Sequence, residues 1–134
     1  MSGYQTFEVK STQKIEFIDI TSQVREFVRA AKCRDGMLLI FSPHTTAGVT
    51  INENADPDVP RDIGEFFKHL LPRQDYFRHA EGNSPAHILS SLVGASETLI
   101  VHNDEPLLGS WQGIFFCEFD GPRQRRFFLK IIPG

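Results

Sequence analysis

The sequence lacks the features that mark several classes of protein. Its 134 residues contain only two cysteines, two methionines and one tryptophan, and the 14 Lys and Arg are outnumbered by 17 Asp and Glu. The formal net charge of −3 gives no basic field, so neither nucleic acid nor an anionic membrane surface is an expected partner. Ten glycines and eight prolines are too few for a collagen-like or low-complexity chain. These absences leave one folded domain, residues 1–134, as the expectation.

Cysteine use and the shortness of the apolar runs predict a cytoplasmic protein. Cys33 and Cys117 form no CxxC pair, and we expect both to be reduced thiols because disulfides are rare in the cytosol. The longest apolar run, Met37–Phe41, is far below the roughly 20 residues that span a bilayer. Residues 1–10 have no basic segment followed by an apolar stretch, so they do not resemble a secretory signal.

Phenylalanine, by contrast, is abundant: the chain has 12, against two tyrosines and one tryptophan. A phenylalanine ring buries a large area without a polar atom, which suits cores and subunit interfaces. Several rings fall late in the chain, where alternation makes both faces of the predicted strands apolar: Phe115, Phe116, Phe119, Phe127 and Phe128. We therefore expect one face of this strand pair to meet another subunit.

Both ends of the chain predict β-strands. Residues 7–10 and 15–20 are rich in β-branched and aromatic side chains and are separated by a polar turn, which predicts a hairpin. Residues 114–119 and 125–132 flank Asp120-Gly121-Pro122, which predicts a second antiparallel hairpin. Further strands are predicted at 37–41, 47–51 and 98–101.

Three helices are predicted between these strands. Thr21 is the expected N-cap of the first, which has an amphipathic pattern and ends before Asp35-Gly36. The second covers 59–70, and the third has Ser84 as its expected N-cap and ends at Gly94. Strands at both ends with helices between them, without a regular β-α-β alternation, predict an α+β fold with a mainly antiparallel sheet.

Histidines and amides gather in two segments. His44 follows a predicted buried strand, while His79 and His87 lie on either side of a Gly82-Asn83 turn that could fold them together. Three neutral imidazoles with an open fourth position would form a catalytic zinc site, with the carboxylate of Glu53 or Glu81 as ligand or base. The alternative is that each histidine is a surface or hydrogen-bonded residue, and His69 and His102 are interpreted that way.

An arginine cluster follows the last predicted turn. Arg123, Arg125 and Arg126 could bind phosphate, since guanidinium groups match phosphate oxygens in two-point contacts. The alternative is a charged turn in which they pair with Glu118 and Asp120. Alternation places Ile114, Phe116 and Glu118 on one strand face and Phe115, Cys117 and Phe119 on the other.

Six motifs resemble the YjbQ-like family, also labelled the secondary thiamine-phosphate synthase family. They are Ser-Pro-His-Thr-Thr-Ala at 42–47, Ile-Asn-Glu-Asn-Ala-Asp-Pro-Asp-Val at 51–59, Arg-His-Ala-Glu-Gly-Asn-Ser at 78–84, Ala-His-Ile at 86–88, Leu-Gly-Ser-Trp-Gln at 108–112 and Glu-Phe-Asp-Gly-Pro-Arg at 118–123. The resemblance implies an α+β fold on an antiparallel, sandwich-like sheet with about three helices. It also implies a homotrimer and a polar pocket that gathers His44, His79 and His87.

The activity attached to the family joins a hydroxymethylpyrimidine pyrophosphate to a thiazole phosphate, so the resemblance implies a small phosphorylated substrate. In such a site His44, His79 and His87 would hold a divalent metal ion, zinc or magnesium, or bind phosphate directly, with His44 and His87 catalytic. Glu53 would be a metal ligand or general base. The expected substrate-binding residues are Thr45, Asn52, Asn83, Ser84, Trp111 and Arg123. Trp111 would stack on a heteroaromatic ring or, alternatively, pack in the core.

One stretch departs from the family pattern, and two other functions remain open. Residues 100–106 stand where relatives have a proline and a short glycine-containing turn, which alters the expected pocket rim. Ser110 stands where threonine is usual and keeps the hydroxyl. A metal-dependent hydrolase would use the same three histidines to activate water. A non-enzymatic module would bind a phosphate-bearing ligand without converting it.

Overall fold

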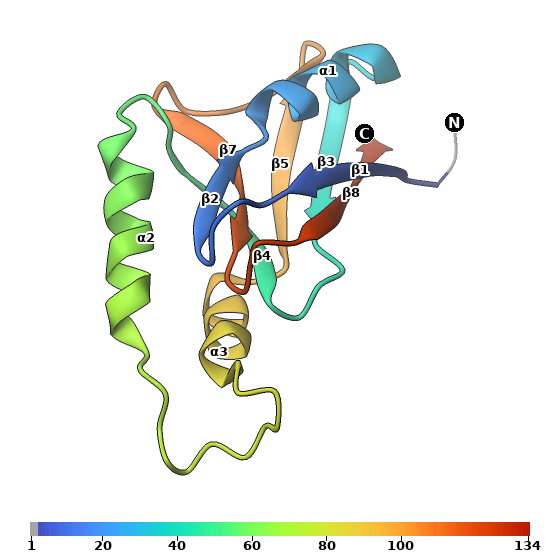
Figure 1. Ribbon diagram of the computed structural model, residues 1–134. Helices are drawn as coiled ribbons and strands as arrows, with labels where there is room; N and C mark the ends of the chain where they lie inside the picture. The colour runs from blue at the N-terminus through green and yellow to red at the C-terminus, as the bar shows by residue number, and fades with distance from the viewer. Residues whose placement is uncertain (1–2) are drawn as a thin grey trace.

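The computed structural model describes residues 3–134 and shows two antiparallel sheets that pack face to face (Figure 1). The five-stranded sheet has the order β1 (Gln5–Lys10), β8 (Gln124–Pro133), β3 (Asp35–Phe41), β5 (Ser96–His102) and β6 (Glu105–Pro106). The three-stranded sheet has the order β2 (Glu16–Asp19), β7 (Gln112–Glu118) and β4 (Ala47–Glu53). The helices are α1 (Thr21–Ala31), α2 (Asp58–Leu70) and α3 (Ser84–Val93). The predicted α+β class with three helices is confirmed.

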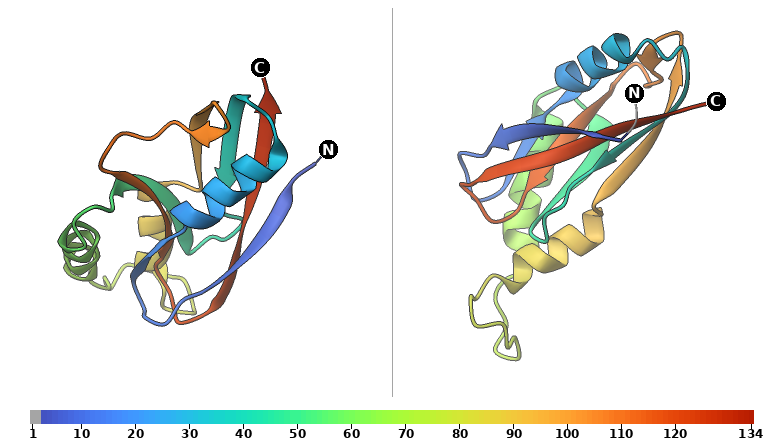
Figure 2. Two further views of the ribbon diagram at one scale, coloured as in Figure 1. Left: turned by 90° about the horizontal axis from the view of Figure 1, so that it is seen from above. Right: turned by 90° about the vertical axis from the view of Figure 1, so that its right-hand side faces the viewer.

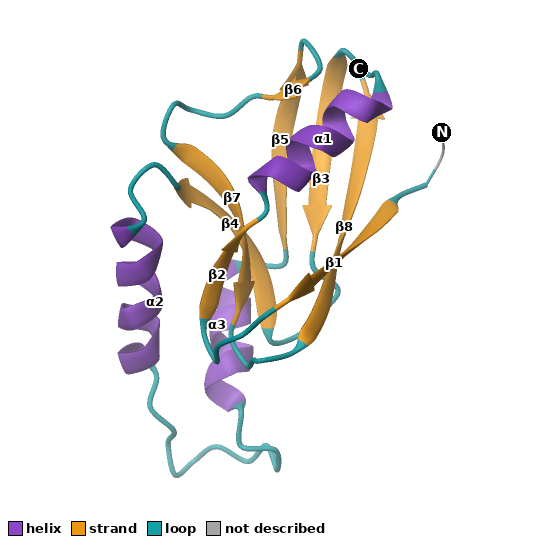
Figure 3. Cartoon of the chain, turned by 45° about the horizontal axis from the view of Figure 1, so that its top comes forward, coloured by secondary structure: helices purple, strands orange, loops and turns teal. Residues whose placement is uncertain are grey.

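The main core lies between the two sheets and under α1. Leu38 and Ile40 on β3, Phe116 on β7 and Phe127 on β8 are fully buried there. Figure 3 shows α1 crossing one face of the five-stranded sheet, where its apolar side contributes Val24, Phe27 and Val28. α1 ends at Ala31 with Lys32 in a left-handed conformation, so the predicted stop at Asp35-Gly36 comes too late, inside β3.

β7 is buried on both faces within the chain itself. Ile114 and Phe116 belong to the core between the sheets, while Phe115, Cys117 and Phe119 belong to a second core under α2 and α3. The predicted alternation is therefore confirmed. The second face of β7 needs no second subunit, because α2 and α3 cover it. That one face of the strand pair 114–119 and 125–132 meets another subunit stays a prediction.

Both predicted hairpins are wrong in their pairing. β1 pairs with β8 and β2 pairs with β7, so each predicted hairpin has one strand in each sheet. The chain crosses between the sheets twice at the same edge, where Ser11 N–H donates to Arg123 O at 2.9 Å and Gly121 N–H donates to Lys14 O at 3.0 Å. Figure 2 shows these two crossings, the connection from β1 to β2 and the connection from β7 to β8, running side by side from one sheet to the other.

The two predicted N-cap residues lie one position inside their helices. Ile20 and Asn83 hold the N-cap positions of α1 and α3, and neither makes a side-chain cap hydrogen bond. The hydroxyl of Thr21 instead accepts the N–H of Ile114 at 2.9 Å, which ties α1 to β7. Gly94, with a φ of 99°, ends α3 as predicted. None of the helices described is long and apolar enough to cross a membrane.

Candidate functional site

His44 lies in the turn between β3 and β4. Its Nε2 accepts the backbone N–H of Arg126 at 3.0 Å, and its ring meets the ring of Phe116 edge-on, with centroids 6.3 Å apart. Burial lowers the pKa of His44, and the nearby charge of Arg125 lowers it further. His44 is therefore held as a neutral hydrogen-bond acceptor, which matches the hydrogen-bonded alternative for this residue.

His79 and His87 are brought together as the sequence predicts. Gly82, with a φ of 75°, donates its N–H to His79 O at 3.1 Å and closes the turn between them. The two imidazole centroids are 5.1 Å apart with the rings nearly perpendicular. Glu81 Oε1 lies 3.9 Å from His79 Nε2 on the exposed side. This pair lies at the start of α3, with Ser84 half-buried beside it.

Asp120 gathers three donors next to this turn. Asn83 Nδ2 and one terminal nitrogen of Arg123 each donate to Asp120 Oδ2 at 2.8 Å, and Lys14 Nζ lies 3.3 Å from Oδ1. Burial alone would raise the pKa of Asp120, but these hydrogen bonds and charges bring it below its usual value. Arg123 is thus committed to a carboxylate of its own chain, as the charged-turn alternative predicts.

Arg125 and Glu118 form a buried ion pair between the sheets. Their side chains are 5% and 0% exposed, and Arg125 Nε lies 2.9 Å from Glu118 Oε1. Ser11 Oγ donates to the same carboxylate at 2.7 Å, and a terminal nitrogen of Arg125 donates to Thr46 Oγ1 at 2.8 Å. Burial raises the pKa of Glu118, but the hydrogen bonds from Arg125 and Ser11 outweigh it and keep the pKa below its usual value.

Sequence reasoning named this pair only as one alternative and missed its partners. A charged residue at a core-facing position of an apolar strand, as Glu118 is, was the available signal. Ser11 and Thr46 carried no signal, because each lies in a polar segment that turn chemistry explains equally well.

The remaining predicted residues lie elsewhere. Thr45 is exposed beside His44, whereas Asn52, Glu53 and Trp111 lie at the far ends of β4 and β7. β4 runs from Ala47 to Glu53, and at about 3.3 Å per residue this separates its ends by roughly 20 Å. Glu53 therefore cannot reach the histidines of its own chain as ligand or base.

Trp111 lies outside the core. Its side chain is 65% exposed, so the alternative of a core tryptophan is wrong. Its carbonyl accepts the N–H of Asn54 at 3.0 Å, which fixes the loop before β7 to the end of β4. The carbonyl oxygen of the Asn52 side chain accepts the N–H of Glu53 at 2.7 Å and so serves the local backbone.

The three-histidine metal pocket is not formed by this chain. Within residues 3–134 no group of three or more His, Cys, Asp or Glu is arranged to hold a metal ion. His79 and His87 adjoin each other, but the Nε2 of His44 is already occupied by Arg126 N–H. His69 is hydrogen-bonded to Glu65 O, one turn earlier in α2, and His102 to Asp35 on the neighbouring strand β3, each at 2.8 Å.

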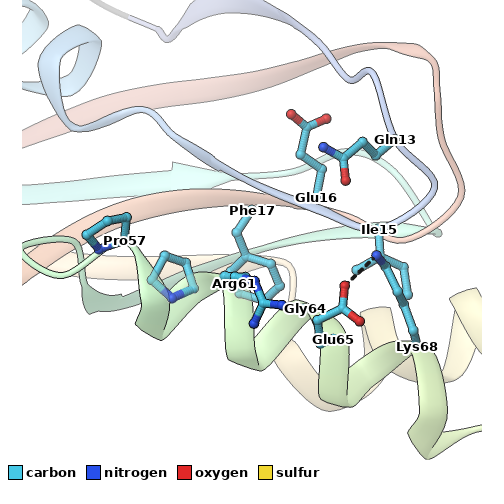
Figure 4. Close-up of a pocket in the computed structure, with 10 residues that line it drawn as sticks. Gln13, Ile15, Glu16, Phe17, Pro57, Arg61, Gly64, Glu65 and Lys68 are labelled. Atoms are coloured by element: carbon cyan, nitrogen blue, oxygen red, sulfur yellow. Dashed lines mark hydrogen bonds and ion pairs between the residues drawn. The ribbon is translucent and has the colours of Figure 1, made fainter.

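An open groove with a volume of about 290 Å³ runs between β2 and α2 (Figure 4). Arg61, Glu65 and Lys68 of α2 face Gln13 and Glu16 across it, over a floor that includes Phe17. Lys68 Nζ lies 2.9 Å from Glu65 Oε1, so these charges are already paired. None of the residues predicted to form the site lines this groove.

Comparison with known proteins gives one consistent match. The family model described as "UPF0047 protein YjbQ-like" matches residues 5–134. The chain belongs to this family. UPF0047 protein MJ1081 of Methanocaldococcus jannaschii is 54% identical over 126 residues, covering 94% of this chain and 91% of the relative. UPF0047 protein YugU of Bacillus subtilis is 50% identical over 129 residues, covering 96% and 98%.

Solved structures of relatives have the same fold. The crystal structure of an uncharacterized conserved protein of the YjbQ/UPF0047 family from Clostridium acetobutylicum superposes with a TM-score of 0.91 at 50% identity, covering 96% of this chain and 99% of that one. Hypothetical protein APE1520 from Aeropyrum pernix superposes with a TM-score of 0.92 at 32% identity, covering 99% and 100%. The sandwich described above is therefore the fold of the family.

These findings correct the function expected from the sequence. MJ1081 and YugU are named as UPF0047 proteins and the Clostridium acetobutylicum relative as an uncharacterized conserved protein, so these matches do not support the expected thiamine-phosphate synthase activity. The metal-dependent hydrolase depended on the same three histidines, which form no metal-binding group in the described chain. Arg123 and Arg125, two of the three arginines predicted to bind phosphate, are instead paired with Asp120 and Glu118.

His44 predicts a specific acid sensitivity. Its folded pKa is below 6.5, so its neutral form contributes stability fully above pH 6.5, and this contribution is lost as the pH falls from 6.5 through the lower folded value. We expect chemical denaturation between pH 7.5 and 5 to show a loss of up to about 1.4 kcal/mol per pH unit from this group. The variant His44→Gln, which keeps an acceptor for Arg126 N–H, should have a flatter profile. An unchanged slope in the variant would contradict this assignment.

Proposed function

We propose that the protein acts as a homo-oligomer that assembles through the outer face of the five-stranded sheet. This outer sheet face comprises the outward-pointing side chains of Tyr4, Met37, Leu39, Phe41, Ile100, Phe128 and Ile132. On the opposite face of β3, Leu38 and Ile40 are at 0% exposure. The supporting observation is that these exposed apolar side chains adjoin one another on β3, β5 and β8, with Thr98 and Lys130 as polar residues among them.

An exposed apolar face of this kind is unusual in a protein that stays monomeric. Antiparallel sheets that face water on one side normally alternate apolar and polar residues. Here Met37, Phe41 and Ile100 are 49%, 40% and 61% exposed on adjoining strands. Large contiguous apolar patches mark interaction sites, since leaving them in water forgoes the free energy of burial.

The outer sheet face also has the shape of a contact surface. It contains a hollow of about 200 Å³ lined by Tyr4, Leu39, Phe41 and Phe128, with Lys130 at its border. The ring of Phe128 lies 4.9 Å from that of Tyr4 and 6.3 Å from that of Phe41, so the aromatic side chains form one cluster. Rings clustered around a hollow can receive a side chain from a partner, and aromatic residues are enriched at such interfaces.

A second copy of this chain is the occupant that we propose. The homotrimer implied by the family resemblance requires each subunit to bury a surface that is exposed in one chain alone. A three-fold ring uses a heterologous interface, in which the outer sheet face would meet a different surface of the neighbouring subunit.

The test is a matched pair of lysine substitutions. Ile100→Lys places a charge in the centre of the outer sheet face, whereas Phe66→Lys places the same charge on α2, where the side chain is equally exposed at 62%. By light scattering coupled to size exclusion, we expect the wild type and Phe66→Lys to have three times the mass of one chain. Ile100→Lys should shift toward the monomer at the same concentration.

Two results would overturn the proposal. One is a monomeric wild type at micromolar concentrations. The other is an unchanged mass for Ile100→Lys together with a reduced mass for Phe66→Lys, which would move the interface to α2. Circular dichroism on each variant separates loss of assembly from loss of folding.

Three expectations of the sequence stay predictions. The divalent metal ion and the small phosphorylated ligand are implied by the family resemblance. The adjoining side chains of His79 and His87 are the residues of this chain that would contact them. The cytoplasmic location is supported by the two cysteines, which are both free thiols in this structure.

A further inference from the structure

The segment 107–111, which joins β6 to β7, carries a tryptophan into solvent. Trp111 is the only tryptophan of the chain, and its side chain is 65% exposed. Single apolar side chains on a surface are common, so exposure alone does not mark a site. Trp111 differs from such residues in how firmly its segment is held.

Hydrogen bonds on both sides fix the backbone around Trp111. The carbonyl of Trp111 accepts the N–H of Asn54 at 3.0 Å, which ties it to the end of β4. Gln112 donates its N–H to Gly109 O at 3.1 Å, and its Oε1 accepts the N–H of Gly109 at 2.8 Å, so one residue closes the turn twice. The backbone at Trp111 is therefore held in place before any contact is made, and only the rotation of the indole remains to be fixed on binding.

The five-stranded sheet separates Trp111 from the hollow of the outer sheet face. Trp111 directly precedes β7, whose sheet packs on the inner face of the five-stranded sheet. The hollow lies on the outer face over β8 and β3, next to Tyr4, whereas the segment 107–111 leaves from β6 at the other edge. Figure 3 shows the connection from β6 to β7 on the side of the molecule away from β1. A chain therefore cannot place Trp111 in its own hollow, but a neighbouring chain can.

The hollow suits an indole ring in chemistry and in size. It is lined by the rings of Tyr4, Phe41 and Phe128 and by the side chain of Leu39. A cavity of about 150 Å³ is enough to hold benzene, so a hollow of about 200 Å³ receives a larger ring. Lys130 lies at its border, and a cation over the face of a tryptophan ring is the strongest pair of this kind.

We propose that Trp111 of one subunit inserts into the hollow of the outer sheet face of the next. The inference rests on the self-association proposed above and supplies the second surface that a three-fold, heterologous ring requires. Because the two surfaces lie at opposite edges of the same sheet, each chain can give its Trp111 to one neighbour and receive the Trp111 of the other. Trp111 is then an interface anchor, a role in which tryptophan is strongly enriched.

Tryptophan fluorescence tests the burial of Trp111 directly, because the chain has no other tryptophan. We expect the assembled wild type to emit at shorter wavelength than Ile100→Lys and to be quenched less by acrylamide. Phe66→Lys, which keeps the assembly, should emit like the wild type. Diluting the wild type until size exclusion shows single chains should move its emission to that of Ile100→Lys.

A mixed assembly tests whether the hollow is the surface that buries Trp111. Chains labelled with ¹⁵N are combined, by dilution and reconcentration, with chains that carry ¹³C only in leucine methyl groups. We expect a nuclear Overhauser effect between the indole N–H of Trp111 and the methyl protons of Leu39, which can arise only between subunits. Leu39→Ile in the leucine-labelled chains keeps the apolar volume and should remove this signal alone.

A truncation measures how much the indole contributes to assembly. Trp111→Ala should lower the affinity of each interface about 30-fold or more, as expected for a tryptophan at the centre of an interface. Circular dichroism should be unchanged, because this side chain lies outside the core. Tyr76→Ala is the matched control, since Tyr76 is 77% exposed on the connection from α2 to α3 and belongs to neither surface.

The outcomes separate this inference from the proposed self-association. A wild type of three chains whose Trp111 emits and is quenched as in Ile100→Lys would overturn the inference and leave self-association intact. So would a Trp111→Ala variant that assembles as tightly as the wild type, as expected if the indole instead stacks on a small ligand. Burial of Trp111 without an Overhauser effect to Leu39 would place the indole against another surface and contradict the pairing. A monomeric wild type would overturn both proposals.

Discussion

Replacing Arg125 by methionine is expected to lower the free energy of unfolding by about 3–5 kcal/mol, because it leaves the carboxylate of Glu118 buried without its cation. Glu118 is fully buried, and Arg125 holds both of its oxygens while also binding Thr46. The remaining donors, Ser11 Oγ and the N–H of Asp120, are neutral and cannot compensate the charge. Equilibrium unfolding in guanidinium chloride measures the loss.

The neighbouring arginine provides the control. Arg126 is exposed, so Arg126→Met should change stability by no more than about 0.5 kcal/mol. The double variant Arg125→Met with Glu118→Leu removes both charges and should regain much of the lost stability, since an apolar pair of similar volume is often as stable as a buried ion pair. If the double variant were less stable than Arg125→Met, the polar network as a whole, and not the unmatched charge, would determine stability.

Phe116→Ala is expected to cost about 3–5 kcal/mol as well, through the cavity that it leaves between the two sheets. Phe116 is fully buried on the central strand of the three-stranded sheet, and its ring lies 6.2 Å from that of Phe127 on the five-stranded sheet. It therefore contacts the opposing sheet directly. The same guanidinium titration gives the change in free energy.

Phe66→Ala is the matched control for this truncation. It removes the same atoms from a side chain that is 62% exposed on α2, so its effect should be below about 0.5 kcal/mol. A double-mutant cycle between Phe116 and Phe127 should give a coupling of about 0.5–3 kcal/mol, as expected for side chains in contact. Additive effects of the two truncations would show that the rings do not stabilise each other across the sheets.

Local sequence patterns predicted the elements better than their pairing. Alternation of apolar residues correctly separated the two faces of β7, because side chains on a strand point to opposite faces regardless of which strands lie beside it. The two hairpin predictions were wrong because a polar turn of a few residues can either reverse the chain within one sheet or carry it to the other sheet. The backbone hydrogen bonds that decide this join Ser11 to Arg123 and Lys14 to Gly121, more than a hundred residues apart.

In the candidate site, too, local sequence patterns predicted contacts between neighbouring segments but not contacts between distant ones. His79 and His87 were expected to meet because a short turn with Gly82 joins them, and they do. His44 depends on a contact with Arg126, 82 positions away, which no local pattern contains. The distance between Glu53 and the histidines is set by the length of β4, and the strand predicted at 47–51 already implied that His44 and Glu53 lie near its opposite ends.

The position of β8 has a consequence for how the chain can be made. β8 contains residues 124–133, yet it lies between β1 and β3, where it supplies the partner for the first strand. Until residues 124–129 have been synthesised, β1 has no strand to pair with and Phe7 has no Phe127 to stack on. A sheet that depends on pairing between sequence-distant strands folds slowly. In the growing polypeptide β1 must therefore stay unpaired on the ribosome until nearly all of the described chain has been translated, whereas β3 can pair earlier with β5.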